Sequence, residues 1–225
     1  MKNSRNDLND LSKGRGSRQT KKARLGGYLI VTDTSKTEAN YFNSIWKSVQ
    51  NSIQGEDDGL IKVCKDMKTE EMIAEAQKLR NESPRYREVW LIFDRDFVKN
   101  FDGMIREISK NDMHAGWSNP CFEIWLSAYF GEMSKECNPK QCTQKFEKLL
   151  REHCHINQYD KADPRLRDRL VKYGSETEAI AFAKKRYKEV CGQYSKPSDM
   201  IGSTTVYQLV EELLDKAGLL KLEKA

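Results

Sequence analysis

The sequence lacks the features that would place a protein in a membrane or in the secretory pathway. No apolar run is long enough to span a bilayer, and residues 1–24 contain no apolar segment of the signal-peptide kind. The six cysteines are scattered through the chain and are expected to be reduced thiols. We therefore expect a cytoplasmic protein with no membrane partner.

Two further absences narrow the organisation and the function. The sequence has no GxxxxGK[ST] loop, so ATP hydrolysis of the P-loop type would have to come from another protein. It has no repeat and no low-complexity linker, and its 225 residues are enough for one sizeable core or a core with a helical extension. The net charge of +5 is only mildly basic and does not by itself indicate a polyanionic partner.

The first 26 residues differ in composition from the rest of the chain. They are polar, and their second half is rich in lysine and arginine, from Lys13 to Arg24. This composition predicts a basic disordered tail over residues 1–26. Two interpretations stay open, a solubilising arm and a segment that grips nucleic acid.

Between residues 27 and 132, short apolar runs alternate with helical patterns. The strongest strand candidates are Gly27 to Asp33 (GYLIVTD) and Glu88 to Asp96 (EVWLIFDRD), and weaker ones cover Leu60 to Cys64 and Met113 to Trp117. This alternation predicts an α/β core with a mostly parallel sheet flanked by helices. Residues 133–225 have helical patterns and are expected to form a C-terminal helical subdomain packed on the core. Within them, Ser203 to Thr205 is predicted to cap the last helix.

Both of the strongest strand candidates end in acidic residues. Asp33 closes the first, Asp94 closes the second, and Asp96 follows two residues later. The carboxyl ends of strands in an open α/β sheet form the crevice in which sites occur. Neighbouring carboxylates repel each other, and Mg²⁺, which prefers oxygen ligands, would offset this repulsion. The alternative is that Asp94 and Asp96 pair with nearby bases such as Arg95.

Two other groups of residues suggest binding chemistry. Lys172 and the Lys184-Lys185-Arg186 string could line a channel for a phosphate backbone, although charged helix faces are more often simply solvated. Cys137, Cys142 and the His153-Cys154-His155 string contain zinc ligands, but their spacing matches no strong zinc template. Scattered buried thiols and a surface pair of histidines are the favoured interpretation.

Four strings of sequence resemble the RloB family of bacterial defence-associated proteins: TEANYF (37–42), VWLIFDRD (89–96), SNPCFEIWL (118–126) and STTVYQLVEEL (203–213). The resemblance implies a Toprim-like fold and a Toprim centre, in which Mg²⁺ (or Mn²⁺) lies between a glutamate at the end of the first strand and an Asp-x-Asp pair. Asp94 and Asp96 match the pair directly. The resemblance also places Glu123 in the site, with Glu38 and Asn119 in supporting positions.

The first motif departs from the family pattern. Family members typically read Cys-Glu-Gly-Glu-x-Thr-Glu, whereas residues 32–38 read TDTSKTE. Asp33 stands where the glutamate is expected; it keeps the charge but is shorter by one methylene. The resemblance implies a Mg²⁺-dependent nuclease that cleaves DNA or RNA in anti-phage defence, with Asp33, Asp94 and Asp96 as metal ligands and Glu123 as a further catalytic acid. The altered motif leaves an alternative open, a weakened or non-cleaving effector or adaptor that binds nucleic acid or a partner ATPase of the ABC or AAA type.

Overall fold

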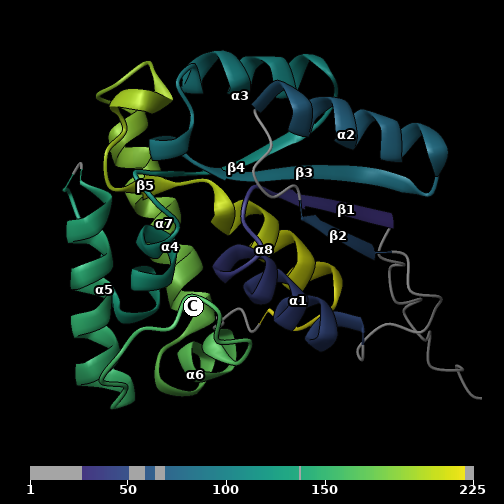
Figure 1. The fold of residues 1–225 in the computed structure, drawn as a ribbon. Helices are drawn as coiled ribbons and strands as arrows, with labels where there is room; N and C mark the ends of the chain where they lie inside the picture. The colour runs from purple at the N-terminus through teal and green to yellow at the C-terminus, as the bar shows by residue number, and fades with distance from the viewer. Residues whose placement is uncertain (1–26, 51–58, 64–68, 137, 221–225) are drawn as a thin grey trace, which may run out of the picture.

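The computed structural model describes residues 27–50, 59–63, 69–136 and 138–220. The tail predicted for residues 1–26 and the zinc candidate Cys137 lie outside these ranges. The described part is built on a five-stranded sheet with the order β2-β1-β3-β4-β5 (Figure 1). The strands are β1 (Gly27–Thr32), β2 (Gly59–Val63), β3 (Tyr86–Asp94), β4 (His114–Asn119) and β5 (Ser203–Thr204). The first four are parallel and β5 is antiparallel to β4, so the expected α/β class with a mostly parallel sheet is confirmed.

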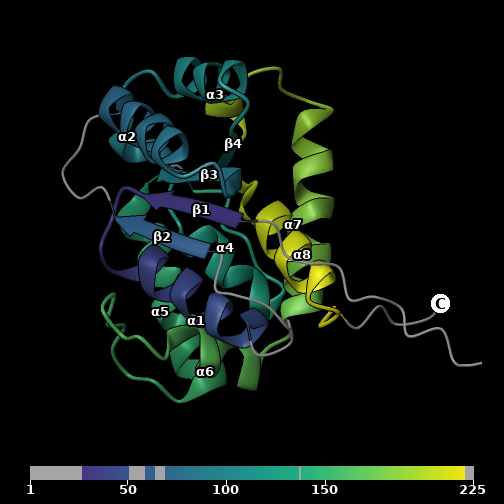
Figure 2. The same cartoon turned by 90° about the vertical axis from the view of Figure 1, so that its right-hand side faces the viewer.

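Helices cover both faces of the sheet (Figures 1 and 2). On one face lie α2 (Thr69–Glu82) and α3 (Phe101–Lys110), and on the other lie α1 (Thr37–Gln50) and α8 (Val206–Lys216). The helices α4 (Glu123–Ser127) and α7 (Glu176–Cys191) contact β5, while α5 (Pro139–Cys154) packs on α4 and α6 (Leu166–Tyr173) packs on α1. Short 3-10 segments occur at Arg95–Phe97 (η1), Ala128–Phe130 (η2) and Pro197–Asp199 (η3).

The continuous apolar run of β1 is explained by burial on both sides. Tyr28 and Ile30 pack into the cluster beneath α1 and α8, while Leu29 and Val31 pack against α2 and α3. Successive side chains of a strand point to opposite faces, so both sets must be apolar when both faces are covered. The larger cluster also includes residues of α5, α6, α7 and α8, so the C-terminal helices share one hydrophobic core with the sheet.

The hydroxyl-rich string before α8 is a sheet strand as well as a helix start. Thr204 donates a hydrogen bond to the Trp117 carbonyl (2.8 Å), and Thr205 donates to the Ala115 carbonyl (2.8 Å). Thr204 also accepts from the Val206 N–H (3.1 Å) at the first residue of α8. The last helix begins directly after this string, as predicted, but Thr205 makes no side-chain cap bond, and the threonine hydroxyls also satisfy backbone groups of β4.

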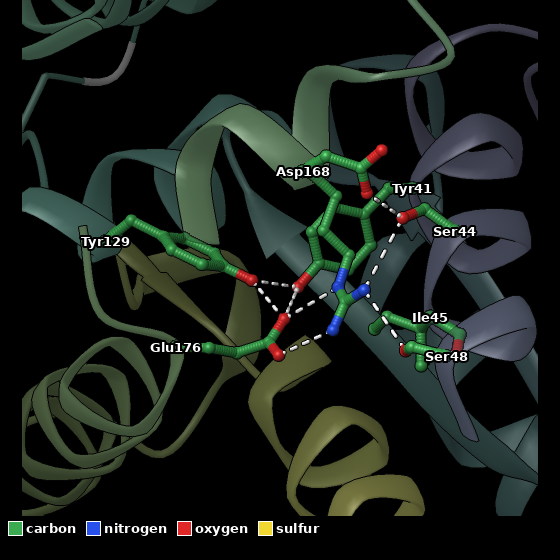
Figure 3. Close-up of polar contacts among 8 residues, drawn as sticks. Tyr41, Ser44, Ile45, Ser48, Tyr129, Asp168 and Glu176 are labelled. Atoms are coloured by element: carbon green, nitrogen blue, oxygen red, sulfur yellow. Dashed lines mark hydrogen bonds and ion pairs between the residues drawn. The ribbon is translucent and has the colours of Figure 1, made fainter. Parts of the chain in front are cut away.

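A buried polar network joins the C-terminal helices to α1 (Figure 3). Arg167 of α6 makes two parallel bonds to Glu176 of α7, from Nε to Oε1 (2.8 Å) and from Nη2 to Oε2 (2.7 Å), and it also reaches two serine hydroxyls of α1. The hydroxyls of Tyr41 and Tyr129 lie 2.7 Å apart, and both also contact Glu176. Breaking a buried ion pair by removing one partner costs about 3–5 kcal/mol, so this network holds α6 and α7 against α1.

Within the described ranges, no helix has both the length and the apolar character needed to cross a membrane.

Candidate acidic centre

Five acidic residues come together where β1 and β3 end. Asp33 directly follows β1, and its N–H donates to the Ile92 carbonyl of β3 (3.4 Å). Asp94 is the last residue of β3, and Asp96 lies in the 3-10 turn that follows it. Glu38 lies in the first turn of α1, and Glu123 begins α4. Parallel strands have their carboxyl ends at the same edge, so the topology brings these segments to one side of the sheet.

Glu38, Asp94 and Glu123 are buried, Asp33 is half-buried and Asp96 is exposed, and these carboxyl groups act on one another electrostatically. Burial and then the charges of Glu38 and Asp96 raise the pKa of Asp33 to about 7. Burial raises the pKa of Asp94 well above its usual value, and the charges of the four other acids act in the same direction. Burial likewise raises the pKa of Glu38, with a further contribution from Glu123. Burial therefore disfavours the charged forms of Asp33, Glu38 and Asp94, and the neighbouring acids add to this effect.

Few neutral donors offset this charge. The Thr34 hydroxyl donates a hydrogen bond to Glu38, and backbone N–H groups of Asp94 and Asp33 lower the pKa of Asp33. One oxygen of Asp33, Oδ1, is buried and has no hydrogen-bond partner within the described part of the chain. A buried acceptor without a partner loses the full free energy of hydration and gains nothing in return. A ligand with positive charge would satisfy it.

The donor set fits a hard divalent cation in its chemistry. The five acids all offer carboxylate oxygen, which suits Mg²⁺ and Mn²⁺. Among the residues that the structure describes, however, no group of three or more His, Cys, Asp or Glu side chains is close enough to hold an ion. For Asp33, Asp94 and Asp96 to hold such a cation, their side chains would have to draw closer together. The same observation gives no support to zinc at His153 and Cys154.

Lys161 is a member of the site that the sequence did not reveal. Its Nζ lies 2.9 Å from Oε1 of Glu123, and the positive charge lowers the pKa of Glu38. It comes from the segment between α5 and α6, far along the chain from the acidic strands. No motif surrounds it. The polar residues Thr37 and Asn40 of the TEANYF string are the one sequence feature connected with it, because both side chains bind the segment that contains Lys161.

Asn119 takes a structural position beside the centre. Its side-chain amide donates to the carbonyls of Pro197 and Ser198 (3.0 Å each), which anchors η3 to the end of β4. The peptide bond to Pro120 is cis, and the Pro120 carbonyl accepts from the Asp96 N–H (3.4 Å). This pair therefore shapes the backbone around Asp96.

The basic residues predicted to bind nucleic acid divide into two kinds. Lys184 pairs with Glu211 (2.8 Å), and Arg186 donates to the carbonyls of Gly202 (3.2 Å) and Ile201 (3.0 Å). Lys172 and Lys185 are exposed, with the Lys172 ammonium 4.9 Å from the centre of the Tyr173 ring. Two of the four thus have internal partners, and nucleic-acid binding by any of them stays a prediction.

Fold and site together define an α/β protein with a buried acidic centre at the carboxyl ends of its central parallel strands. A family model described as RloB-like protein matches residues 28–213, which is most of the chain and contains all five acids and Lys161. The chain belongs to the RloB-like family. No curated protein and no solved structure matches it significantly.

Proposed function

We propose that this chain is a Mg²⁺-dependent nuclease of Toprim type, which hydrolyses phosphodiester bonds of DNA or RNA in bacterial anti-phage defence. The observation that carries the proposal is the set of five carboxyl groups at the ends of β1 and β3, three of which have pKa values raised by burial and by each other. Clusters of like charge with strongly shifted pKa values occur preferentially at functional sites. The strings VWLIFDRD (89–96) and SNPCFEIWL (118–126), whose resemblance to the RloB family implies a Toprim-like centre, favour this type of chemistry.

The five acids would have different roles in this reaction. Asp33, Asp94 and Asp96 would hold the cation, which when bound polarises the phosphodiester and stabilises the leaving oxygen. Glu38 is buried beside them, and its raised pKa brings it closer to the pH at which a carboxylate can both take and give a proton. Glu38 is therefore suited to accept the proton of the attacking water. Glu123 fixes the position of the Lys161 ammonium.

The proposal is tested by cleavage assays on the purified full-length chain. Single-stranded and double-stranded DNA and RNA of one sequence are incubated with Mg²⁺ or Mn²⁺ and, separately, with chelator. We expect metal-dependent cleavage that falls about 100-fold or more in Asp94→Asn, the scale of losing one positioned catalytic group. The matched control is Asp215→Asn, an exposed aspartate of α8. Cleavage that is equal in Asp94→Asn and the wild type would contradict the proposed centre.

The alternative is a defence effector or adaptor that does not cleave and that binds nucleic acid or a partner ATPase. Two observations favour it: Asp33 is shorter than the glutamate of the family pattern, and the described residues present no three ligands close enough for one ion. This alternative predicts that the wild type binds Mn²⁺ or nucleic acid without cleavage. It also predicts that the chain co-purifies with a second protein that carries ATPase activity.

A further inference from the structure

The Lys161 side chain lies at the boundary between the buried acids and solvent. Its ammonium is 2.9 Å from Glu123, whose side chain is 3% exposed, while the Lys161 side chain itself is 52% exposed. An ammonium carries three N–H donors. Glu123 is its one ion-pair partner within the described ranges, so donors remain for a group arriving from solvent.

The backbone around Lys161 is fastened to the first turns of α1. The Thr37 hydroxyl donates to the Lys161 carbonyl (3.2 Å), and the Asn40 amide donates to the Ala162 carbonyl (3.0 Å). The buried Tyr159 hydroxyl also lies 3.2 Å from the Thr37 hydroxyl. Thr37 and Asn40 flank the acid Glu38 in the sequence. The helix that supplies one carboxylate of the centre therefore also sets the position of the ammonium.

A phosphodiester faces an electrostatic obstacle at this centre. It is an anion, and the cluster contains five carboxyl groups, so one divalent cation leaves the site with a surplus of negative charge. A fixed ammonium close to Glu123 and Glu38 lowers this surplus and offers a charge-assisted hydrogen bond to a phosphoryl oxygen.

We propose that Lys161 is the phosphate-contacting residue of this centre, with its ammonium held by Glu123 and its free donors bound to a non-bridging oxygen of the phosphodiester. This inference rests on the proposed function, because it places the phosphodiester over the same acids. Thr37 and Asn40 are positioning residues, since they act through the Lys161 backbone. The TEANYF string thus supplies the acid Glu38 and also positions the backbone of Lys161.

The test measures phosphate binding apart from cleavage. The probe is dimethyl phosphate, a phosphodiester monoanion that does not depend on whether the substrate is DNA or RNA. Its ³¹P relaxation by protein-bound Mn²⁺ gives its affinity for the full-length Mn²⁺-loaded chain, and calorimetry gives the Mn²⁺ affinity. The variants are Lys161→Met and Lys161→Gln, which remove the charge, and Lys161→Arg, which keeps it. The matched control is Lys148→Met, because Lys148 forms an exposed pair with Glu152 (3.7 Å).

We expect dimethyl phosphate to bind the two neutral variants about tenfold or more weakly, as for a lost hydrogen bond between charged groups. Mn²⁺ affinity should change much less, and Lys161→Arg and Lys148→Met should resemble the wild type. Unchanged dimethyl phosphate binding in Lys161→Met and Lys161→Gln would overturn the inference. If these variants also bind Mn²⁺ more tightly than the wild type, Lys161 is instead a counter-ion that the metal displaces. Absence of Mn²⁺ binding to the wild type would overturn the proposed metal centre, and this inference with it.

Discussion

Replacing Asp33 with asparagine should change how the stability of the metal-free protein depends on pH. The pKa of Asp33 is raised from 3.8 to about 7 in the folded chain, first by burial and then by Glu38. A carboxyl group with a raised pKa binds more protons in the folded state than in the unfolded state between these two values. The free energy of unfolding therefore falls as the pH rises through this range. Asparagine does not titrate, so the variant should lose this part of the pH dependence.

The magnitude follows from the size of the shift. One pKa unit corresponds to about 1.4 kcal/mol, so the whole shift would correspond to about 4 kcal/mol if Asp33 carried it alone. Of this stabilisation, about 2 kcal/mol or more is lost as the pH rises from about 5 to about 8. Glu38 and Asp94 lie in the same region, so the three carboxyl groups titrate together rather than one by one. The asparagine variant also removes the charge repulsion that Asp33 exerts on Asp94. The gain in stability of the variant over wild type should therefore grow by about 2 kcal/mol from about pH 5 to about pH 8.

Urea unfolding in chelator at both pH values measures this difference. Glu152→Gln, which removes an exposed carboxylate of α5, is the control and should show a small, flat difference. Adding Mg²⁺ or Mn²⁺ should stabilise the wild type more than Asp33→Asn, because a ligand that binds only the folded state adds to its stability. If the difference between Asp33→Asn and wild type stays constant with pH, then Asp33 does not carry a raised pKa and the reasoning fails.

Three further predictions test other parts of the molecule. Arg167→Met should lower the free energy of unfolding by about 3–5 kcal/mol in urea denaturation, because Glu176 is left buried without its partner; a loss below about 1 kcal/mol would contradict this role of the network. Thr37→Val should weaken dimethyl phosphate binding about threefold while leaving Mn²⁺ affinity unchanged, because it removes one net hydrogen bond to the Lys161 backbone. An equal loss of Mn²⁺ affinity would show that Thr37 acts on metal binding. Asp33→Glu should raise metal-dependent cleavage about tenfold or more if the short side chain holds a ligand away from the ion; unchanged cleavage would show that the aspartate reaches the ion as well as a glutamate does.

The acidic strand ends could be predicted because the signals were local. Val, Ile and Leu runs that end in aspartate mark buried parallel strands, and parallel strands align their carboxyl ends. The helical patterns expected after residue 132 correspond, among the described residues, to α5, α6, α7 and α8.

The remaining parts of the site depend on contacts between distant segments, which leave no local pattern. Lys161 lies in an irregular segment, and only the packing of that segment on α1 brings it to Glu123. The strand β5 has two residues and no apolar alternation, so nothing in the string Ser203 to Thr205 distinguishes it from a helix cap. For the same reason Lys184 could be taken for an exposed base, since its partner Glu211 lies on another helix.

The pairing of β4 with β5 has a consequence for the order in which the molecule folds. The side-chain bonds that tie this edge together connect residues 86 to 90 positions apart. Contacts at such separation form late, because the entropy of closing a long loop is lost before the contact offsets it. Until then the edge of β4 is open, and an open strand edge can pair with other chains. We therefore expect the early folding species to be the one most prone to aggregate, and chaperone dependence during synthesis should centre on the interval before Ser203 and Thr204 emerge.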